Sequence, residues 1–250
     1  MKNIFKNLTI ISFFIGFFIN NVYSLKIVFD PGHGGNNPGC CHEYDGQIVK
    51  EKDLNYKIAL FIKDELSKYE TENGEKVKIY LTRNEFDNPT LAERIDLGIK
   101  FNADIVISLH NNASPSNDHD YRGSMVLVTS SNFNDKYEIE ENLAKNILKE
   151  LNKIGLQIQT EDTILGQAQN INGLLRRLST DESTYLNGDT TDWYGIIRHG
   201  IMKNIPSILV EHAYLSNEQD YREFLSTDDK LKSLSKAVVE GIVQYYSLIG

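Results

Sequence analysis

The stretch Asp104-Ile-Val-Ile-Ser-Leu-His110 is a short apolar run that ends on a histidine. The same arrangement occurs earlier in the chain, where Lys26-Ile-Val-Phe-Asp30 is followed by Pro-Gly-His33-Gly-Gly. Continuous apolar runs of this length are typical of parallel strands buried on both faces. Open α/β sheets bind ligands just beyond the carboxyl ends of such strands. We therefore expect the two imidazoles to meet at one edge of a sheet.

The rest of the chain alternates between strand-like runs and helical periodicity. The strand-like runs cover residues 26–30, 77–82, 104–109, 124–129 and 207–212. Apolar residues recur at helical spacing over residues 54–69, 139–154 and 231–245. Thr90-Leu-Ala-Glu93 is a capping box that predicts a further helix to about Phe101. The alternation predicts an α/β fold in a single domain, with a twisted, mostly parallel or mixed sheet and helices on both faces.

The first 24 residues have the pattern of a signal peptide. Lys2 and Lys6 precede the apolar run Leu8–Ile19, and Val22-Tyr-Ser24 resembles the cleavage site of a signal peptidase. The apolar run is shorter than the roughly 20 residues that span a bilayer, so we expect cleavage and no stable membrane span. A retained anchor is the alternative. Residues 25–250 are then expected to form a single domain.

Composition excludes some partners. The chain carries 26 Lys and Arg against 35 Asp and Glu, a formal charge of −9. Sequence-independent nucleic-acid binding needs basic residues that neutralise phosphates, so no nucleic-acid partner is expected. Cys40 and Cys41 are the only cysteines, and neighbouring cysteines rarely pair, so we expect free thiols. The polar segment Leu156–Tyr194 is predicted to be a long excursion over the surface, and long ordered loops are often functional.

Two carboxylates join the two histidines as candidate site residues. Glu211 ends the apolar run Ile205-Pro-Ser-Ile-Leu-Val210, and a charge at the end of a buried strand requires a partner or a function. Glu51 stands at the start of the first predicted helix, where the helix dipole alone would also favour an acid. His33 and His110 are each, taken alone, equally consistent with a structural role.

Together these residues have the composition of a metal site. Two imidazoles and one carboxylate are a typical catalytic zinc set that leaves a fourth position for water, and a second carboxylate can act as a general base. The remaining histidines are weaker candidates because they lie in polar loops, beside an arginine, or on the opposite face of a strand from Glu211. They are His42, His119, His199 and His212.

Five motifs in order resemble the signature of zinc-dependent N-acetylmuramoyl-L-alanine amidases of bacterial cell walls. They are Asp30-Pro-Gly-His-Gly-Gly35, Lys50-Glu-Lys52, Leu81-Thr-Arg83, Ser108-Leu-His-Asn-Asn-Ala113 and Val210-Glu-His-Ala-Tyr-Leu-Ser-Asn217. The resemblance implies that His33, Glu51 and His110 bind Zn²⁺ and that Glu211 is the catalytic glutamate. It also implies an extracytoplasmic hydrolase that acts on peptidoglycan or muropeptides as an autolysin or remodelling enzyme. The sequence identifies no protein partner.

Two local features depart from that signature. His212-Ala213-Tyr214 replaces the usual aliphatic-Gly-aromatic pattern after the glutamate, and the segment Cys40–Gln47 is enlarged. Both departures affect the expected shape of the substrate-binding cleft. Neither removes a candidate metal ligand. We also expect Asn111, Asn112 or Asp30 to orient an imidazole.

Other functions remain compatible with the same residues. A zinc peptidase that cuts within the stem peptide could use the same ligands and base. A non-catalytic wall-binding or regulatory protein could keep the fold, although it would not need the complete set of ligands and base.

Overall fold

The computed structural model describes residues 23–250 except for 115–120, 131–135 and 160–167. The expected signal peptide, residues 1–24, lies almost wholly outside the described residues, as does His119. Within the described part of the chain, no helix combines the length and the apolar character needed to cross a membrane.

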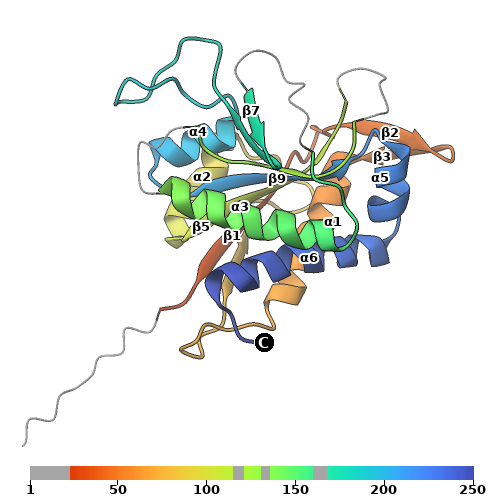
Figure 1. The fold of residues 1–250 in the computed structure, drawn as a ribbon, viewed down its shortest axis with the longest axis horizontal. Coiled ribbons are helices and arrows are strands. Elements are labelled where there is room, and N and C mark those ends of the chain that lie inside the picture. Colours follow the sequence, from red (N-terminus) through yellow and green to blue (C-terminus); the bar gives the residue numbers. More distant parts are fainter. Residues whose placement is uncertain (1–22, 115–120, 131–135, 160–167) are drawn as a thin grey trace, which may run out of the picture.

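A seven-stranded sheet forms the centre of the molecule, with helices on both of its faces (Figure 1), which confirms the expected single-domain α/β fold. The strands are β1 (Lys26–Pro31), β2 (Cys41–Tyr44), β3 (Gln47–Lys50), β4 (Lys78–Leu81), β5 (Ile105–Asn112), β6 (Met125–Leu127), β7 (Ala168–Ile171), β8 (Leu174–Arg177) and β9 (Ser207–Tyr214). The α-helices are α1 (Glu51–Leu66), α2 (Leu91–Phe101), α3 (Lys136–Lys153), α4 (Gly195–Met202), α5 (Glu218–Asp220) and α6 (Asp228–Tyr246), and a π-helix, η1, covers Tyr221–Leu225.

The sheet is mixed, with strand order β4-β1-β5-β9-β6-β8-β7. The neighbours β4, β1, β5 and β9 are parallel, so their carboxyl ends lie at the same edge. β6 runs antiparallel to β9, and β7 runs antiparallel to β8. The parallel half therefore brings together the strand ends that carry His33, His110 and Glu211.

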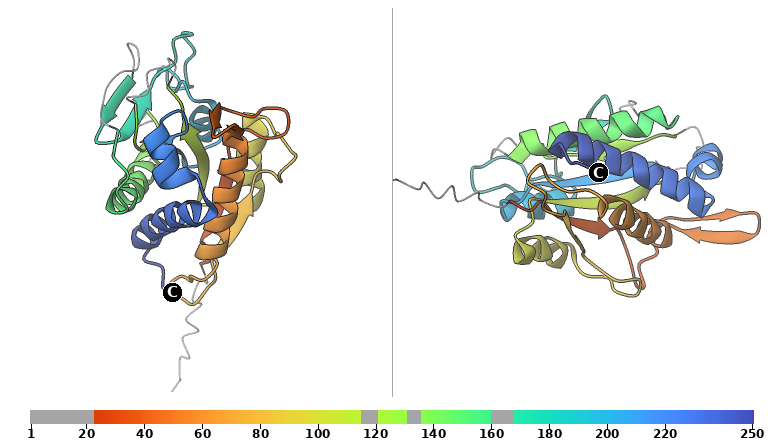
Figure 2. Two further views of the ribbon diagram at one scale, coloured as in Figure 1. Left: turned by 90° about the vertical axis from the view of Figure 1, so that its right-hand side faces the viewer. Right: turned by 90° about the horizontal axis from the view of Figure 1, so that it is seen from below.

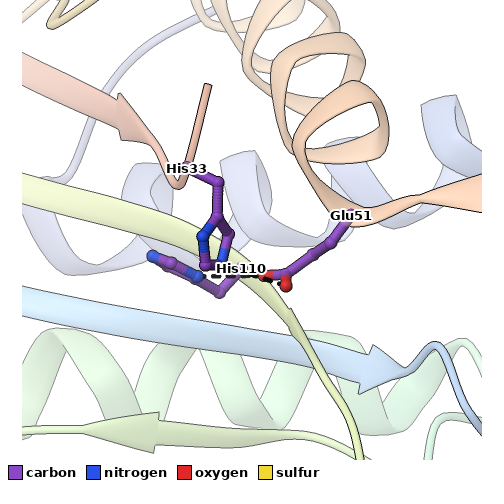
Figure 3. A group of neighbouring side chains, drawn as sticks. All are labelled: His33, Glu51 and His110. Atoms are coloured by element: carbon purple, nitrogen blue, oxygen red, sulfur yellow. Dashed lines mark hydrogen bonds and ion pairs between the residues drawn. The ribbon is translucent and has the colours of Figure 1, made fainter. Parts of the chain in front are cut away.

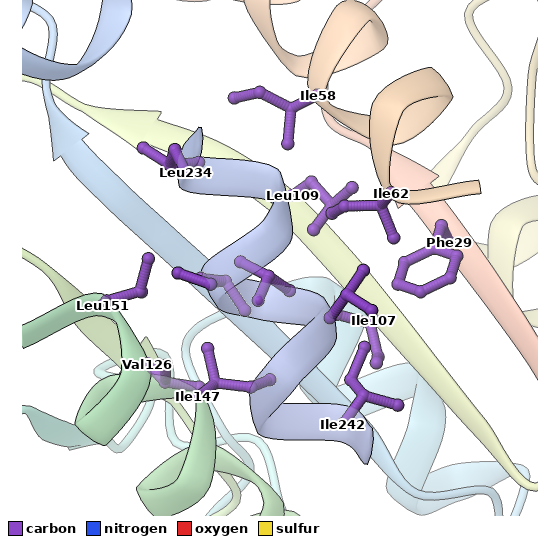
Figure 4. Close-up of a cluster of buried hydrophobic side chains, with 14 of the residues drawn as sticks. Phe29, Ile58, Ile62, Ile107, Leu109, Val126, Ile147, Leu151, Leu234 and Ile242 are labelled. Atoms are coloured by element: carbon purple, nitrogen blue, oxygen red, sulfur yellow. The ribbon is translucent and has the colours of Figure 1, made fainter. Parts of the chain in front are cut away.

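Apolar side chains fill both sides of the sheet. On one face, α1, α3 and α6 pack against the strands (Figure 4) through a cluster that includes Phe29, Ile58, Ile62, Ile107, Leu109, Ile147, Leu234 and Ile242. On the other face, α2 and α4 cover a smaller cluster that includes Val28, Ile95, Val106, Ile197 and Leu209. Burying each side chain of this size contributes about 1.5–3 kcal/mol, so this two-sided core fixes the positions of the strand ends.

The predicted capping box is present at α2. Thr90 accepts a hydrogen bond from the main chain of Glu93, whose side chain in turn accepts one from the main chain of Thr90. This reciprocal pairing satisfies two amide groups that would otherwise lack partners at the start of the helix. It also fixes Leu91, whose side chain lies beside the candidate site, at the first helical position.

We predicted that residues 156–194 form an excursion over the surface. This prediction was wrong in one respect, because the segment contains two strands of the sheet. β7 and β8 form a hairpin that extends the sheet beyond β6. Leu174 and Leu175 of β8 are buried against the core, whereas β7 is a polar strand at the edge of the sheet. A four-residue edge strand with few apolar residues leaves no alternation for a sequence pattern to detect.

A second hairpin, β2 and β3, projects from the body of the molecule (Figure 2) and was not expected from the sequence. Its turn contains Asp45 and Gly46, which both have positive φ angles of 53° and 77°. Asp-Gly is a favoured pair for a two-residue hairpin turn, so the sequence did contain a signal. Cys40 and Cys41, at the base of this hairpin, are both free thiols as expected.

Candidate active site

Three side chains from separate elements converge on one point (Figure 3): His33 from the loop after β1, Glu51 from the first position of α1, and His110 from β5. Nε2 of His33 lies 3.0 Å from Oε2 of Glu51, and Nδ1 of His110 lies 3.0 Å from Oε1. The donor atoms of all three residues lie within 4.8 Å of one another. The structure thus brings together the three residues that the sequence singled out as ligands.

Strand pairing explains why the two histidines meet. β1 and β5 are parallel, with Asp30 opposite Ser108 and Pro31 opposite Leu109. The main chain of Gly32 continues this pairing by donating to the oxygen of Leu109, at 2.9 Å. His33 then takes a φ angle of 61°, a left-handed conformation that costs a non-glycine residue energy and is often found at functional sites.

Two glycines allow the site to be this compact. A Cβ atom on Gly32 would lie 2.2 Å from Cε1 and Nε2 of His110. A Cβ atom on Gly39 would lie 2.5 Å from Oε2 of Glu51 and 2.6 Å from Cδ2 of His33. The backbone therefore lies directly against all three candidate ligands, and any side chain at these two positions would displace them.

Glu51 is buried and held by several donors. Its Oε2 accepts from the main chain of Cys40 at 2.9 Å, and its Oε1 accepts from the main chain of Asn111 and from Nδ2 of Asn55, both at 3.2 Å. Burial alone would raise the pKa of Glu51, but hydrogen bonds and charge from His110 and His33 lower it below its usual value. The carboxylate is thus kept ionised, as a metal ligand must be.

A hydrogen bond assigns the tautomer of His33. Oδ1 of Asn37 accepts from the main chain of Gly39 at 3.1 Å, which identifies this atom as the amide oxygen. Nδ1 of His33 lies 3.2 Å from the same oxygen and therefore donates to it. With its proton on Nδ1, a neutral His33 would present the lone pair of Nε2 to a metal ion, the arrangement that partners of ligating histidines usually impose.

The donor set fits a zinc ion. Two neutral imidazole nitrogens and a carboxylate oxygen are common zinc donors, with bonds of about 2.0–2.2 Å. Donors on one tetrahedral ion lie about 3.4 Å apart, close to the 3.0 Å that separates each imidazole nitrogen from Glu51. These three residues could therefore hold a metal and leave a coordination position open.

Glu211 faces the same site from β9. It pairs in register with His110 of β5, and its side chain lines a cavity of about 320 Å³ together with His33, Glu51 and His110. Within the described residues, its buried Oε2 has no hydrogen-bond partner. Burial, followed by the charge of Glu51, raises the pKa of Glu211 well above its usual value. This carboxylate is thus a stronger base than an exposed glutamate.

The cavity is also lined by Tyr194, a residue that we did not predict from the sequence. It lies next to Gly195 and Ile196 at the start of α4, and all three line the cavity. Burial, followed by the charge of Glu211, raises the pKa of Tyr194, while a hydrogen bond from Arg177 lowers it. The Tyr194 phenol therefore remains protonated beside the candidate base. No periodic pattern pointed to Tyr194, because it stands at the end of an irregular segment.

The expectation that Asn111, Asn112 or Asp30 orients an imidazole was wrong. The side chain of Asn111 donates to Asn55, and that of Asn112 lies 3.9 Å from the sulfur of Met125. Asp30 instead forms a buried ion pair with Arg94 of α2. Asn37 takes the expected role at His33, and its position four residues after the histidine in a tight loop was the available signal.

The remaining described histidines lie outside the donor set, as expected. His42 packs against Tyr44, with 4.6 Å between ring centroids, and His199 lies on α4. His212 is fully buried, and burial lowers its pKa to about 4, so the ring is neutral. Its Nδ1 lies 2.7 Å from the main-chain oxygen of His110, where it donates and supports the strand that carries the candidate ligand.

Several known proteins are similar to this chain in sequence and in fold. AmiC of Escherichia coli, named an N-acetylmuramoyl-L-alanine amidase, is 25% identical over 234 residues, which cover 89% of this chain and 53% of the relative. The probable amidase AmiB of Haemophilus influenzae is 28% identical over 239 residues, covering 89% and 52%. The chain therefore matches about half the length of these curated relatives.

A solved structure agrees with these sequence matches. The structure of the amidase AmiC2 of Nostoc punctiforme has a TM-score of 0.61 and 25% identity, covering 89% of this chain and 97% of that one. Residues 27–244 of this chain match the family described as N-acetylmuramoyl-L-alanine amidase (Amidase_3). The five motifs, the mixed α/β sheet and this match agree, and the chain belongs to the Amidase_3 family of N-acetylmuramoyl-L-alanine amidases.

Proposed function

We propose that this chain is a zinc hydrolase that cleaves the amide between the lactyl group of N-acetylmuramic acid and the L-alanine of the peptidoglycan stem peptide. The observation that carries the proposal is the position of Glu211. Its carboxylate shares a cavity with His33, Glu51 and His110, and its buried Oε2 has no partner among the described residues. Membership of the amidase family supports this substrate.

His33, Glu51 and His110 would hold the metal. When bound, zinc supplies Lewis-acid chemistry that polarises a carbonyl group and makes water more acidic. The main-chain amides of Cys40 and Asn111, together with Asn55, fix the Glu51 carboxylate, so the protein itself orients this candidate ligand.

Glu211 would move the proton. It accepts a proton from the water that attacks the lactyl carbonyl carbon, and it returns a proton to the L-alanine nitrogen as the carbon–nitrogen bond breaks. The products are a free muramic acid carboxyl group and a peptide with a free N-terminal L-alanine. General base and acid catalysis of this kind contributes about 10²–10⁴-fold to the rate.

Part of the cavity wall is apolar. Ala113, Ile196 and Leu209 provide apolar walls next to Glu211. An apolar surface of this size accommodates the methyl group of L-alanine, whereas a charged side chain at the same position would lose its hydration.

We further propose that residues 1–24 are a signal peptide, that residues 25–250 form the catalytic domain, and that the enzyme acts outside the cytoplasm on the cell wall as an autolysin or remodelling enzyme. The positive start, short apolar run and cleavage-site pattern of the leader support export. The names of the amidase relatives support a cell-wall substrate.

Product analysis distinguishes this function from its rivals. Purified protein with zinc is incubated with cell wall, and the soluble products are identified by mass spectrometry. The proposal requires intact stem peptides that begin with L-alanine. Cleavage between two stem residues would instead identify a peptidase, and an unchanged wall would identify a non-catalytic binding protein. The Glu211→Gln variant is the control for contaminating hydrolases.

A further inference from the structure

Arg177 and Trp193 stack on each other next to Tyr194, a residue that lines the candidate active site. Arg177 is the last residue of β8, and its main-chain oxygen accepts from the nitrogen of Trp193 at 2.8 Å. The guanidinium carbon of Arg177 lies 4.2 Å from the centroid of the Trp193 ring, within cation–π distance. Trp193 is 42% exposed, so the pair lies at the surface.

Arg177 is joined to the cavity through one side chain. The Arg177 guanidinium stacks on Trp193, which immediately precedes Tyr194 in the chain, and it is close enough to the Tyr194 phenol to lower its pKa. Tyr194 lines the cavity with Glu211 and His110, and its hydroxyl is close enough to Glu211 for that charge to act on it. The Tyr194 phenol is therefore near both the Arg177 cation and the candidate base.

No carboxylate of the described residues neutralises Arg177, which is notable in a chain with a formal charge of −9. Its neighbour Arg176 points to the other face of β8 and pairs with Glu141 at 2.7 Å. A planar guanidinium binds a carboxylate through two parallel hydrogen bonds, and stacking on an aromatic ring orients it. The pair thus has the chemistry of a carboxylate-binding site.

We propose that Arg177 binds a carboxylate of the stem peptide and that Trp193 is a positioning residue that holds the guanidinium toward the cavity. This inference rests on the proposed amidase function and extends it to substrate specificity. Successive residues of a peptide lie about 3.8 Å apart between Cα atoms, so a carboxylate close behind the L-alanine can approach Arg177 while the amide lies at Glu211.

Trp193 also provides the readout, because it is the only tryptophan in the chain. The Glu211→Gln protein, which binds substrate without consuming it, is titrated with three probes while the tryptophan emission is followed. The probes are N-acetylmuramoyl-L-alanyl-D-glutamate with both carboxylates free, the same compound with its α-carboxylate amidated, and the compound with both carboxylates amidated.

We expect the doubly amidated probe to bind about tenfold more weakly than the free acid. The singly amidated probe then shows which carboxylate Arg177 contacts. Arg177→Gln should bind all three probes equally, and Arg177→Lys should keep part of the preference as a point charge. Arg176→Gln is the matched control, because it removes the same charge one residue away and should keep the full preference.

Kinetics separate binding from a general structural effect. In the protein with Glu211 intact, Arg177→Gln should raise KM for the free acid about tenfold and leave kcat within about twofold. Trp193→Ala should raise KM in the same way, and Trp193→Phe should restore it because a ring is again present.

Equal binding of the free and doubly amidated probes to the protein with Arg177 intact would overturn this inference. That result is distinct from failure of the proposed function. If no probe loses its L-alanine amide, the amidase proposal fails, whereas cleavage without a preference for the carboxylate rejects only the role of Arg177.

Discussion

Arg94 of α2 holds the main chain of His33 in place, with 2.8 Å between its Nη2 and the His33 oxygen. Its Nη1 pairs with Asp30 at 2.7 Å, and both side chains are buried. One guanidinium thus connects the end of β1, the left-handed turn at His33 and the helix on that face of the sheet. This contact helps to stabilise the left-handed conformation of His33.

Replacing Arg94 should be costly, because it would leave Asp30 buried without its cation. We expect Arg94→Met to lower the free energy of unfolding by about 3–5 kcal/mol. Urea denaturation measures this, with Lys57→Met as the control. Lys57 forms an exposed ion pair with Asp228 at 2.9 Å, and such pairs contribute about 0–1 kcal/mol. Equal losses in the two variants would contradict the structural role given to Arg94.

Asn55 should affect metal affinity without being a ligand. Its Nδ2 donates to Glu51, and its Oδ1 accepts from Asn111. Loss of a group that supports a ligand typically weakens metal binding about 10–100-fold, and we expect this for Asn55→Ala in competition with a chromophoric chelator. Asn146→Ala is the control, because the Asn146 amide is exposed and bonds only within its own helix. An unchanged affinity in Asn55→Ala would show that the other donors suffice to hold Glu51.

Gly32 should be intolerant of even one added methyl group. A Cβ there would lie 2.2 Å from the His110 ring, which must move away from Glu51 to accommodate it. We therefore expect Gly32→Ala to bind less than a tenth of the zinc of the native protein, measured by metal analysis after gel filtration. Gly46→Ala strains a positive φ of 77° but meets no atom within 4 Å, so it should keep its zinc. Full metal content in Gly32→Ala would mean that His110 is not a ligand.

The buried Glu140 should make the free energy of unfolding depend on pH. It is buried between the main-chain nitrogens of Thr129 and Ser207, each 2.9 Å from one of its oxygens, and burial raises its pKa to about 8. The folded state therefore binds this proton more tightly than the unfolded state, where the pKa is near 4.5. The stability from this group is full below about pH 4.5 and falls as the pH rises toward 8.

The Glu140→Gln variant isolates that effect, because glutamine does not titrate. The free energy of unfolding of the native protein minus that of the variant should become smaller between pH 5 and pH 8.5. Glu138→Gln, exposed on the same helix, controls for changes that are not specific to the buried group. A difference that stays constant with pH would contradict the raised pKa.

Much of the fold and of the site could be predicted from the sequence, for identifiable reasons. Parallel strands buried on both faces leave continuous apolar runs, and the runs before His33, His110 and Glu211 were detectable for that reason. Since such strands end at one edge, the convergence of these side chains followed. The family resemblance then supplied Glu51, which alone looked like an ordinary acid at a helix start.

The parts that could not be predicted depend on contacts between distant segments. Strands β7 and β8 are short, and two of the four residues of β7 are polar, so their pairing is visible only once β6 is in place. From the sequence, Arg94 looks like a surface residue of an amphipathic helix. Only the folded structure places it against Asp30. Tyr194 comes from an irregular segment, where no periodicity fixes the direction of a side chain, and Arg177 ends a strand of only four residues.

The most direct test of the account compares the native protein with Glu211→Gln on N-acetylmuramoyl-L-alanyl-D-glutamate, by measuring zinc content and released amino groups together. Both proteins should carry about one zinc. The native protein should release peptide with a free N-terminal L-alanine, and the variant should do so at least about 100-fold more slowly. A native protein that carries zinc but releases no such peptide, or a variant that remains fully active, would contradict the account.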